Sequence, residues 1–184
     1  MKERAFDPRR LDVRALAGAG AVLSGEWPQA SFQRLCASTL ALADMPLPPV
    51  AWAVRVALRT QLGGKAQHCL YLEAHTVVRL ECQRCLMPMP QVIDINRQFL
   101  FVRDEAEATR LDEHSEEDVL VLADKLDLAE LVEDELILTL PLVPRHETCP
   151  QPLLVPAPAA ADADARPAHP FAALATLRGS TPSG

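Results

Sequence analysis

Alternation between apolar and polar side chains is the sequence feature that most constrains the fold. It occurs in three stretches: residues 50–60, 68–82 and 90–103. In the first, Val50, Trp52 and Val54 fall on one face, whereas Arg55 and Arg59 fall on the other. Such alternation is typical of a β-strand with one buried face. The three stretches therefore predict an antiparallel β-meander or a small barrel-like sheet.

Two or three helices are predicted to pack on this sheet, which gives an α+β fold. Asp7 and Pro8 form a helix-start signal, so a first helix is expected from about Pro8 to Leu16. Residues 29–42 form the second helical or loosely ordered piece. The clearest helix is "LDLAELVEDELILTLP" (126–141), which Asp127 can cap and which the prolines at its end terminate.

The remaining segments differ in composition. Residues 104–118 are rich in Asp and Glu and are predicted to be a solvated loop, followed by a short strand at 119–124. The sequence predicts a single α+β domain at 1–149. A disordered, Pro- and Ala-rich linker is expected at 150–168, followed at 169–184 by a short apolar motif and tail.

Charge is divided unevenly along the chain. Residues 1–103 hold 13 Lys and Arg against 8 Asp and Glu, a net charge of +5, whereas the rest carries −12. A whole-chain charge of −7 argues against a broad, non-specific nucleic-acid binder but allows a local basic patch. The five cysteines form no disulfide framework, which favours a reducing compartment. No apolar run is long enough for a membrane span, so no membrane partner is expected.

A C-x-x-C motif, Cys82 and Cys85 in "RLECQRCLMPMP", closes the second predicted strand. This spacing lets two thiolates reach one zinc ion, and a tetrahedral site then needs two further ligands. His146 and Cys149 in "RHETC" supply that number. The sequence thus offers a Cys₃His zinc site whose two halves lie far apart in the chain.

Two alternatives to a zinc site remain open. In the first, the cysteines only close a hairpin turn, and the sequence slightly favours this because the second half lacks one cysteine of a C-x-x-C pair. In the second, they form a redox pair, which is disfavoured because no helix N-terminus follows to lower the thiol pKa. The sequence contains none of the G-x-S-x-G, P-loop or G-x-G-x-x-G motifs, so a non-enzymatic protein is expected.

Several motifs together resemble the bacterial YceD family of large ribosomal RNA subunit accumulation proteins. They are "FDPRRL", Phe32-x-Arg34-Leu35, "LECQRCL", "LDLAELVEDELILTLPLVPRH" and "HPFAALATLR". The resemblance implies a cytoplasmic, non-enzymatic factor for synthesis, processing or stability of 23S ribosomal RNA. It also implies a partner, either that RNA or its precursor directly or a ribosomal protein. Many relatives carry a cysteine-rich stretch where this chain has only His146 and Cys149.

Arginines of the meander are the candidate RNA contacts: Arg55, Arg59, Arg79, Arg84 and Arg97. Arginine suits phosphate binding and stacking on unpaired bases. Few aromatic residues accompany these arginines, so sequence-specific reading of bases is not supported. Backbone contact with RNA, contact with a basic ribosomal protein, and a metal-dependent or thiol enzyme are the alternatives that remain.

Overall fold

A five-stranded sheet organises the protein. The computed structural model describes residues 6–41, 46–60, 66–112, 115 and 117–150. The strands are β1 (Val22–Trp27), β2 (Val50–Thr60), β3 (Ala66–Glu81), β4 (Pro88–Val102) and β5 (Asp118–Val121). The helices are α1 (Val13–Ala19), α2 (Gln33–Ala37), α3 (Glu105–Asp112) and α4 (Leu128–Thr139), with 3-10 turns η1 (Pro8–Arg10) and η2 (Gln29–Ser31).

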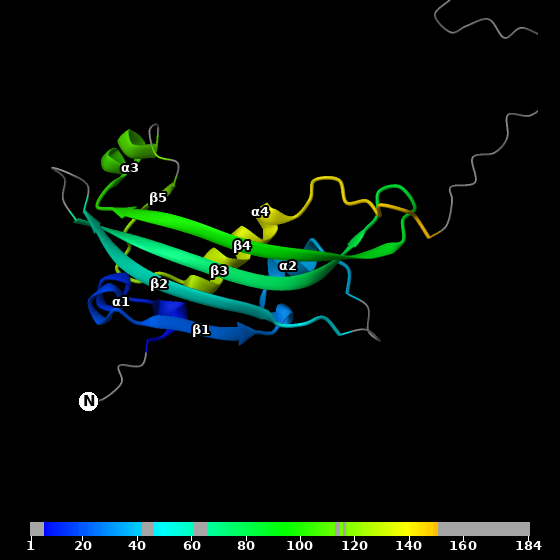
Figure 1. The fold of residues 1–184 in the computed structure, drawn as a ribbon, viewed down its shortest axis with the longest axis horizontal. Coiled ribbons are helices and arrows are strands. Elements are labelled where there is room, and N and C mark those ends of the chain that lie inside the picture. The colour runs from blue at the N-terminus through cyan, green and yellow to red at the C-terminus, as the bar shows by residue number, and fades with distance from the viewer. Residues whose placement is uncertain (1–5, 42–45, 61–65, 113–114, 116, 151–184) are drawn as a thin grey trace, which may run out of the picture. The chain divides into compact units, whose positions relative to one another are not determined.

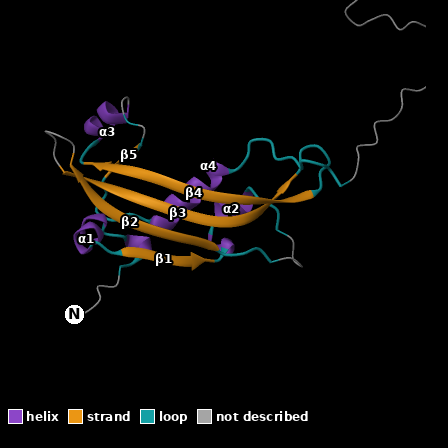
Figure 2. Ribbon diagram, viewed as in Figure 1, coloured by secondary structure: helices purple, strands orange, loops and turns teal. Residues whose placement is uncertain are grey.

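The strands lie in the order β1-β2-β3-β4-β5, as Figure 2 shows. β1 to β4 form an antiparallel meander, and β5 pairs in parallel with β4. The predicted α+β meander is therefore confirmed. Closure into a barrel is not seen in the described part of the chain, because β1 and β5 are the two edges of an open sheet. β1 was not predicted from the sequence.

β3 and β4 continue beyond the start of β2 as a two-stranded ribbon. β2 begins at Val50, whereas β3 and β4 remain paired as far as Glu81 and Pro88. The ribbon ends in the turn that carries the C-x-x-C motif. The long β3–β4 pairing therefore sets this turn away from the rest of the sheet (Figure 1).

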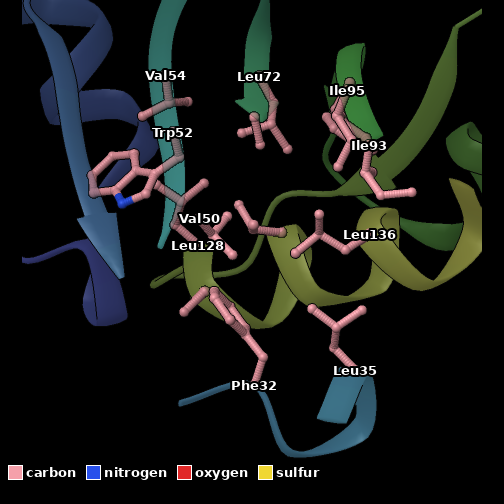
Figure 3. Close-up of a cluster of buried hydrophobic side chains, with 14 of the residues drawn as sticks. Phe32, Leu35, Val50, Trp52, Val54, Leu72, Ile93, Ile95, Leu128 and Leu136 are labelled. Atoms are coloured by element: carbon pink, nitrogen blue, oxygen red, sulfur yellow. The ribbon is translucent and has the colours of Figure 1, made fainter. Parts of the chain in front are cut away.

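The hydrophobic core lies between the sheet and α4. Leu128 and Leu136 of α4 face the strands, and Phe32 and Leu35 pack against the helix from the side of α2 (Figure 3). These four side chains are at most 1% exposed. Asp127 caps α4 as predicted, accepting hydrogen bonds from the backbone N–H groups of the first turn. Packing in the core thus sets the position of α4, and with it the place from which the following segment starts.

Three predicted segments differ from the structure. The helix expected from Pro8 to Leu16 is divided into η1 and α1, because Asp12 caps a second start by accepting from the Ala15 N–H at 2.9 Å. Only 33–37 within the second segment is α-helical. The predicted acidic loop contains α3, whose first turn Asp104 caps through the Glu107 N–H at 2.9 Å.

The predicted linker and C-terminal motif lie outside the described residues beyond Pro150. Their prediction as a disordered linker and an apolar motif therefore stays a prediction. Within the described residues, no helix is both long and apolar enough to cross a membrane.

Candidate metal centre

The turn between β3 and β4 places the first two cysteines. The Cys82 N–H donates to the Met87 carbonyl at 3.0 Å, and the Leu86 N–H donates to the Cys82 carbonyl at 2.8 Å. Leu86 adopts a left-handed conformation with φ of 59°, which is uncommon for a residue with a Cβ. Cys82 is fully buried and Cys85 half-buried. The tight turn brings both thiols to one side of the ribbon end.

The segment after α4 returns to this turn and supplies the second half of the site. Figure 1 shows the segment in orange beside the green β3–β4 turn. The Gln83 N–H donates to the Pro144 carbonyl at 2.9 Å. The Arg84 guanidinium donates to the carbonyls of His146 and Glu147 at 2.9 and 3.2 Å. One backbone hydrogen bond and two from the Arg84 side chain therefore hold the two segments together in addition to the contacts of the cysteines.

Cys82, Cys85, His146 and Cys149 converge on one point. Their ligand atoms all lie within 4.8 Å of one another. Cys82 Sγ is 3.9 Å from Cys149 Sγ, and Cys85 Sγ is 3.4 Å from His146 Nδ1. A tetrahedral zinc with Zn–S bonds near 2.3 Å separates its sulfurs by about 3.8 Å. The donor set and its spacing therefore fit a tetrahedral metal ion.

This convergence decides between the geometric alternatives that the sequence left open. An isolated hairpin turn, which the sequence slightly favoured, is wrong because His146 and Cys149 lie beside the first two cysteines. The long separation along the chain had counted against a shared site. It is spanned by β4, β5 and α4, whose packing no local motif reveals.

The electrostatic surroundings of the centre favour the thiolate form of Cys82. Burial of Cys82 opposes ionisation, but the backbone N–H groups of His146, Cys85 and Arg84 outweigh it and lower the pKa of this thiol to about 5. Burial, together with the neighbouring thiols of Cys149 and Cys82, raises the pKa of Cys85. Ionisation is therefore easier at Cys82 than at Cys85, and a bound cation would favour the thiolate form of both.

Arg84, predicted from the sequence as an RNA contact, lies at the candidate centre and contacts Cys149 and the backbone of the returning segment. Its Nε lies 3.0 Å from Cys149 Sγ, and this contact raises the pKa of the guanidinium. A cation donating to a metal-binding thiolate partly neutralises the excess negative charge of a three-thiolate site. No sequence signal indicated this role, because Arg84 lies between the two cysteines of a motif that tolerates any residue there.

The other predicted RNA-contacting arginines do not share one surface. Arg55 is exposed on the open face of the sheet, 3.6 Å above the Tyr71 ring centroid. Arg59 forms a two-pronged ion pair with Glu117. Arg97 points to the helix side, where its Nε donates to the buried Glu135 at 3.1 Å. Arg79 is buried, at 8% exposure. Arg55, Arg84 and Arg97 are therefore the exposed members of the set, and Arg55 contacts a ring whereas the other two bind backbone carbonyls or a carboxylate.

Known proteins that are similar to this chain indicate its family. The family model described as "Large ribosomal RNA subunit accumulation protein YceD" matches residues 70–178, which include the four candidate ligands. A curated relative with the same description, from Haemophilus influenzae (strain ATCC 51907 / DSM 11121 / KW20 / Rd), is 41% identical over 71 residues. That alignment covers 39% of this chain and 41% of the relative, so the chain spans about two fifths of the relative's length. No solved structure matches.

The matched region comprises more than half of the chain and includes most of β3, all of β4 and α4, and the converging cysteines. The chain belongs to the YceD family.

Proposed function

We propose that the protein is a non-enzymatic, cytoplasmic factor for the synthesis, processing or stability of 23S ribosomal RNA during assembly of the large ribosomal subunit. The family match over residues 70–178 carries this proposal. The curated relative bears the same description, in which accumulation of the large-subunit ribosomal RNA is the named property.

We propose further that Cys82, Cys85, His146 and Cys149 hold one zinc ion. Thiolates and imidazole favour zinc over ions that prefer oxygen, such as magnesium or calcium. Four protein ligands fill a tetrahedral site, whereas a catalytic zinc keeps one position open for water or substrate. The ion would therefore fasten the β3–β4 turn to the segment after α4, and it would have no free position for chemistry.

The described residues provide little support for an enzyme outside this centre. His75 Nδ1 lies 2.6 Å from Asp94 Oδ1 on the open face of the sheet, and both side chains are exposed. A nucleophile activated by such a pair would have to lie within hydrogen-bonding reach of the imidazole. No hydroxyl or thiol of the described residues is hydrogen-bonded to His75. This supports the non-enzymatic function over a nuclease or a thiol enzyme.

RNA contact, where it is direct, is proposed to involve Arg55. Its stacking on Tyr71 holds the guanidinium plane on an exposed face, where it can reach a phosphate. A second candidate function is that of an adaptor that reaches the RNA through a basic ribosomal protein. The engagement of Arg59, Arg84 and Arg97 in contacts within the protein favours this second candidate.

Ultraviolet crosslinking of the tagged full-length protein in growing cells, followed by sequencing of the attached RNA, tests the proposed function. Reads concentrated in 23S ribosomal RNA or its precursor are expected. Reads spread over messenger RNA in proportion to transcript abundance would contradict the proposal.

Binding of purified protein to a 23S fragment separates the two candidates. Arg55→Ala should lower the slope of log affinity against log salt by about 0.7–0.9 for one lost phosphate contact. Arg110→Ala, which removes an exposed arginine on α3, is the matched control and should leave the slope unchanged. An unchanged slope with Arg55→Ala, together with RNA recovery only when a ribosomal protein is present, would establish the adaptor.

A further inference from the structure

A cavity of about 450 Å³ lies beside the part of β3 that extends past β2. Its walls come from η2, from the residues after α2, from the segment before β2 and from β3 itself. Pro28, Leu40, Pro46 and Leu47 form much of its apolar wall, and Arg79 supplies a cation. None of its lining residues belongs to the candidate metal centre. The volume is within the range of small-ligand sites.

Hydrogen bonds fix the walls of this cavity in the described residues. The Gln29 side-chain amide donates to the Pro48 carbonyl at 2.9 Å, to Thr76 Oγ1 at 2.9 Å and to the Val77 carbonyl at 2.8 Å. The Leu40 N–H donates to the Arg79 carbonyl at 2.8 Å. The prolines of the wall have restricted φ angles. These hydrogen bonds therefore tie the walls of the cavity to β3 and to one another.

Arg79 contributes to this wall a buried guanidinium nitrogen that has no hydrogen-bond partner among the described residues. The side chain belongs to a residue that is only 8% exposed, and its Nη1 atom is buried without a hydrogen-bond partner. No carboxylate of the described residues pairs with it, whereas Arg59 and Arg97 each have one. Burying an unpaired charge is costly, and buried polar groups nearly always have partners. This arginine therefore points to an anion that the described chain does not contain.

The chemistry of the walls restricts the anion. One guanidinium matches one negative charge, and its planar fork suits a carboxylate. The described lining residues include no aromatic ring on which a base could stack and no second Lys or Arg for a polyphosphate. We propose that this cavity binds a carboxylate carried on an apolar body. A free aliphatic acid and the C-terminal end of an apolar peptide share that chemistry.

Nuclear magnetic resonance of the full-length, ¹⁵N-labelled protein tests this inference. Hexanoate is expected to shift the amide signals of Ala30, Leu40 and Leu47 in a saturable manner, whereas hexanol, a neutral analogue, should not. Acetyl-Ala-Leu-Leu with a free C-terminus, compared with its amide, distinguishes the two sources. Tighter binding of the peptide acid than of hexanoate identifies a chain terminus, and the reverse order identifies a small acid.

Substitutions make the inference falsifiable. Arg79→Met keeps an apolar stem and should weaken hexanoate binding at least tenfold, whereas Arg79→Lys should keep saturable binding. Arg55→Met is the control on the open face and should bind as the wild type does. Asp44→Asn tests whether the chain's own carboxylate, in a segment outside the described residues, takes the place of the ligand. Two results would overturn the proposal: saturable hexanoate binding seen only in Asp44→Asn, or equal hexanoate affinity of Arg79→Met and the wild type.

Discussion

Removal of zinc is expected to loosen the ribbon end and lower the stability of the whole domain. The proposed centre joins segments that are 61 residues apart, the separation of Cys85 and His146. A cross-link that closes a loop of this length lowers the conformational entropy of the unfolded chain. On the chain-entropy model, this stabilises the folded state by about 4 kcal/mol. For a domain of this size, 4 kcal/mol corresponds to a decrease of about 10 °C in Tm.

Thermal unfolding followed by circular dichroism, with and without a chelator, measures this effect. Cys149→Ser removes one ligand and should unfold near the chelated wild type, with no further response to chelator. Cys36→Ser is the matched control because Cys36 is exposed and lies outside the centre, so its Tm should still depend on zinc. Equal Tm values for wild type with and without chelator would refute the cross-link argument.

Three further predictions concern α4. Leu136→Ala should lower the free energy of unfolding by about 2–5 kcal/mol in urea denaturation. Leu138→Ala, on the exposed side, should change it by less than about 0.5 kcal/mol. Equal losses would contradict the placement of Leu136 in the core. Asp127→Ala should cost about 1 kcal/mol by removing the helix cap, and no loss would show that the cap is dispensable. Burial raises the pKa of Glu135 above its ordinary value of 4.5, against the opposing effect of Arg97, so the folded state binds this proton more tightly than the unfolded chain does. The stability that results is lost as pH rises from 4.5 through the raised pKa. Glu135→Gln should therefore gain stability relative to wild type between pH 4.5 and 7, and a relative loss over that range would reverse the sign of this argument.

The strands were predictable because their signal is local. Alternation alone predicted β2 at its observed bounds, and the Asp127 cap predicted the start of α4. β1 was missed because its sequence, "VLSGEW", is short, contains a glycine and has no strict alternation. α3 was missed because an acid-rich segment resembles a solvated loop unless the Asp104 cap is recognised.

The candidate metal centre was predictable in its residues but not in its geometry. Residue type and spacing selected all four residues that converge, since thiols and imidazole in pairs are the zinc-binding groups of proteins. Their convergence depends on the return of the chain after α4, which tertiary packing decides. The same limit applies to the arginines, because register places Arg55 and Arg97 on opposite faces of the sheet. Counting the arginines in the sequence does not show on which face of the sheet each one lies.

X-ray absorption at the zinc edge tests the central claim most directly. The purified full-length protein should carry one zinc per chain, with three sulfur neighbours near 2.3 Å and one nitrogen neighbour near 2.0–2.1 Å. Cys82→Ser should lower the sulfur count or abolish binding. A protein purified without stoichiometric zinc that fails to take up the ion when it is supplied, or a zinc shell of oxygen and nitrogen alone, would contradict the account.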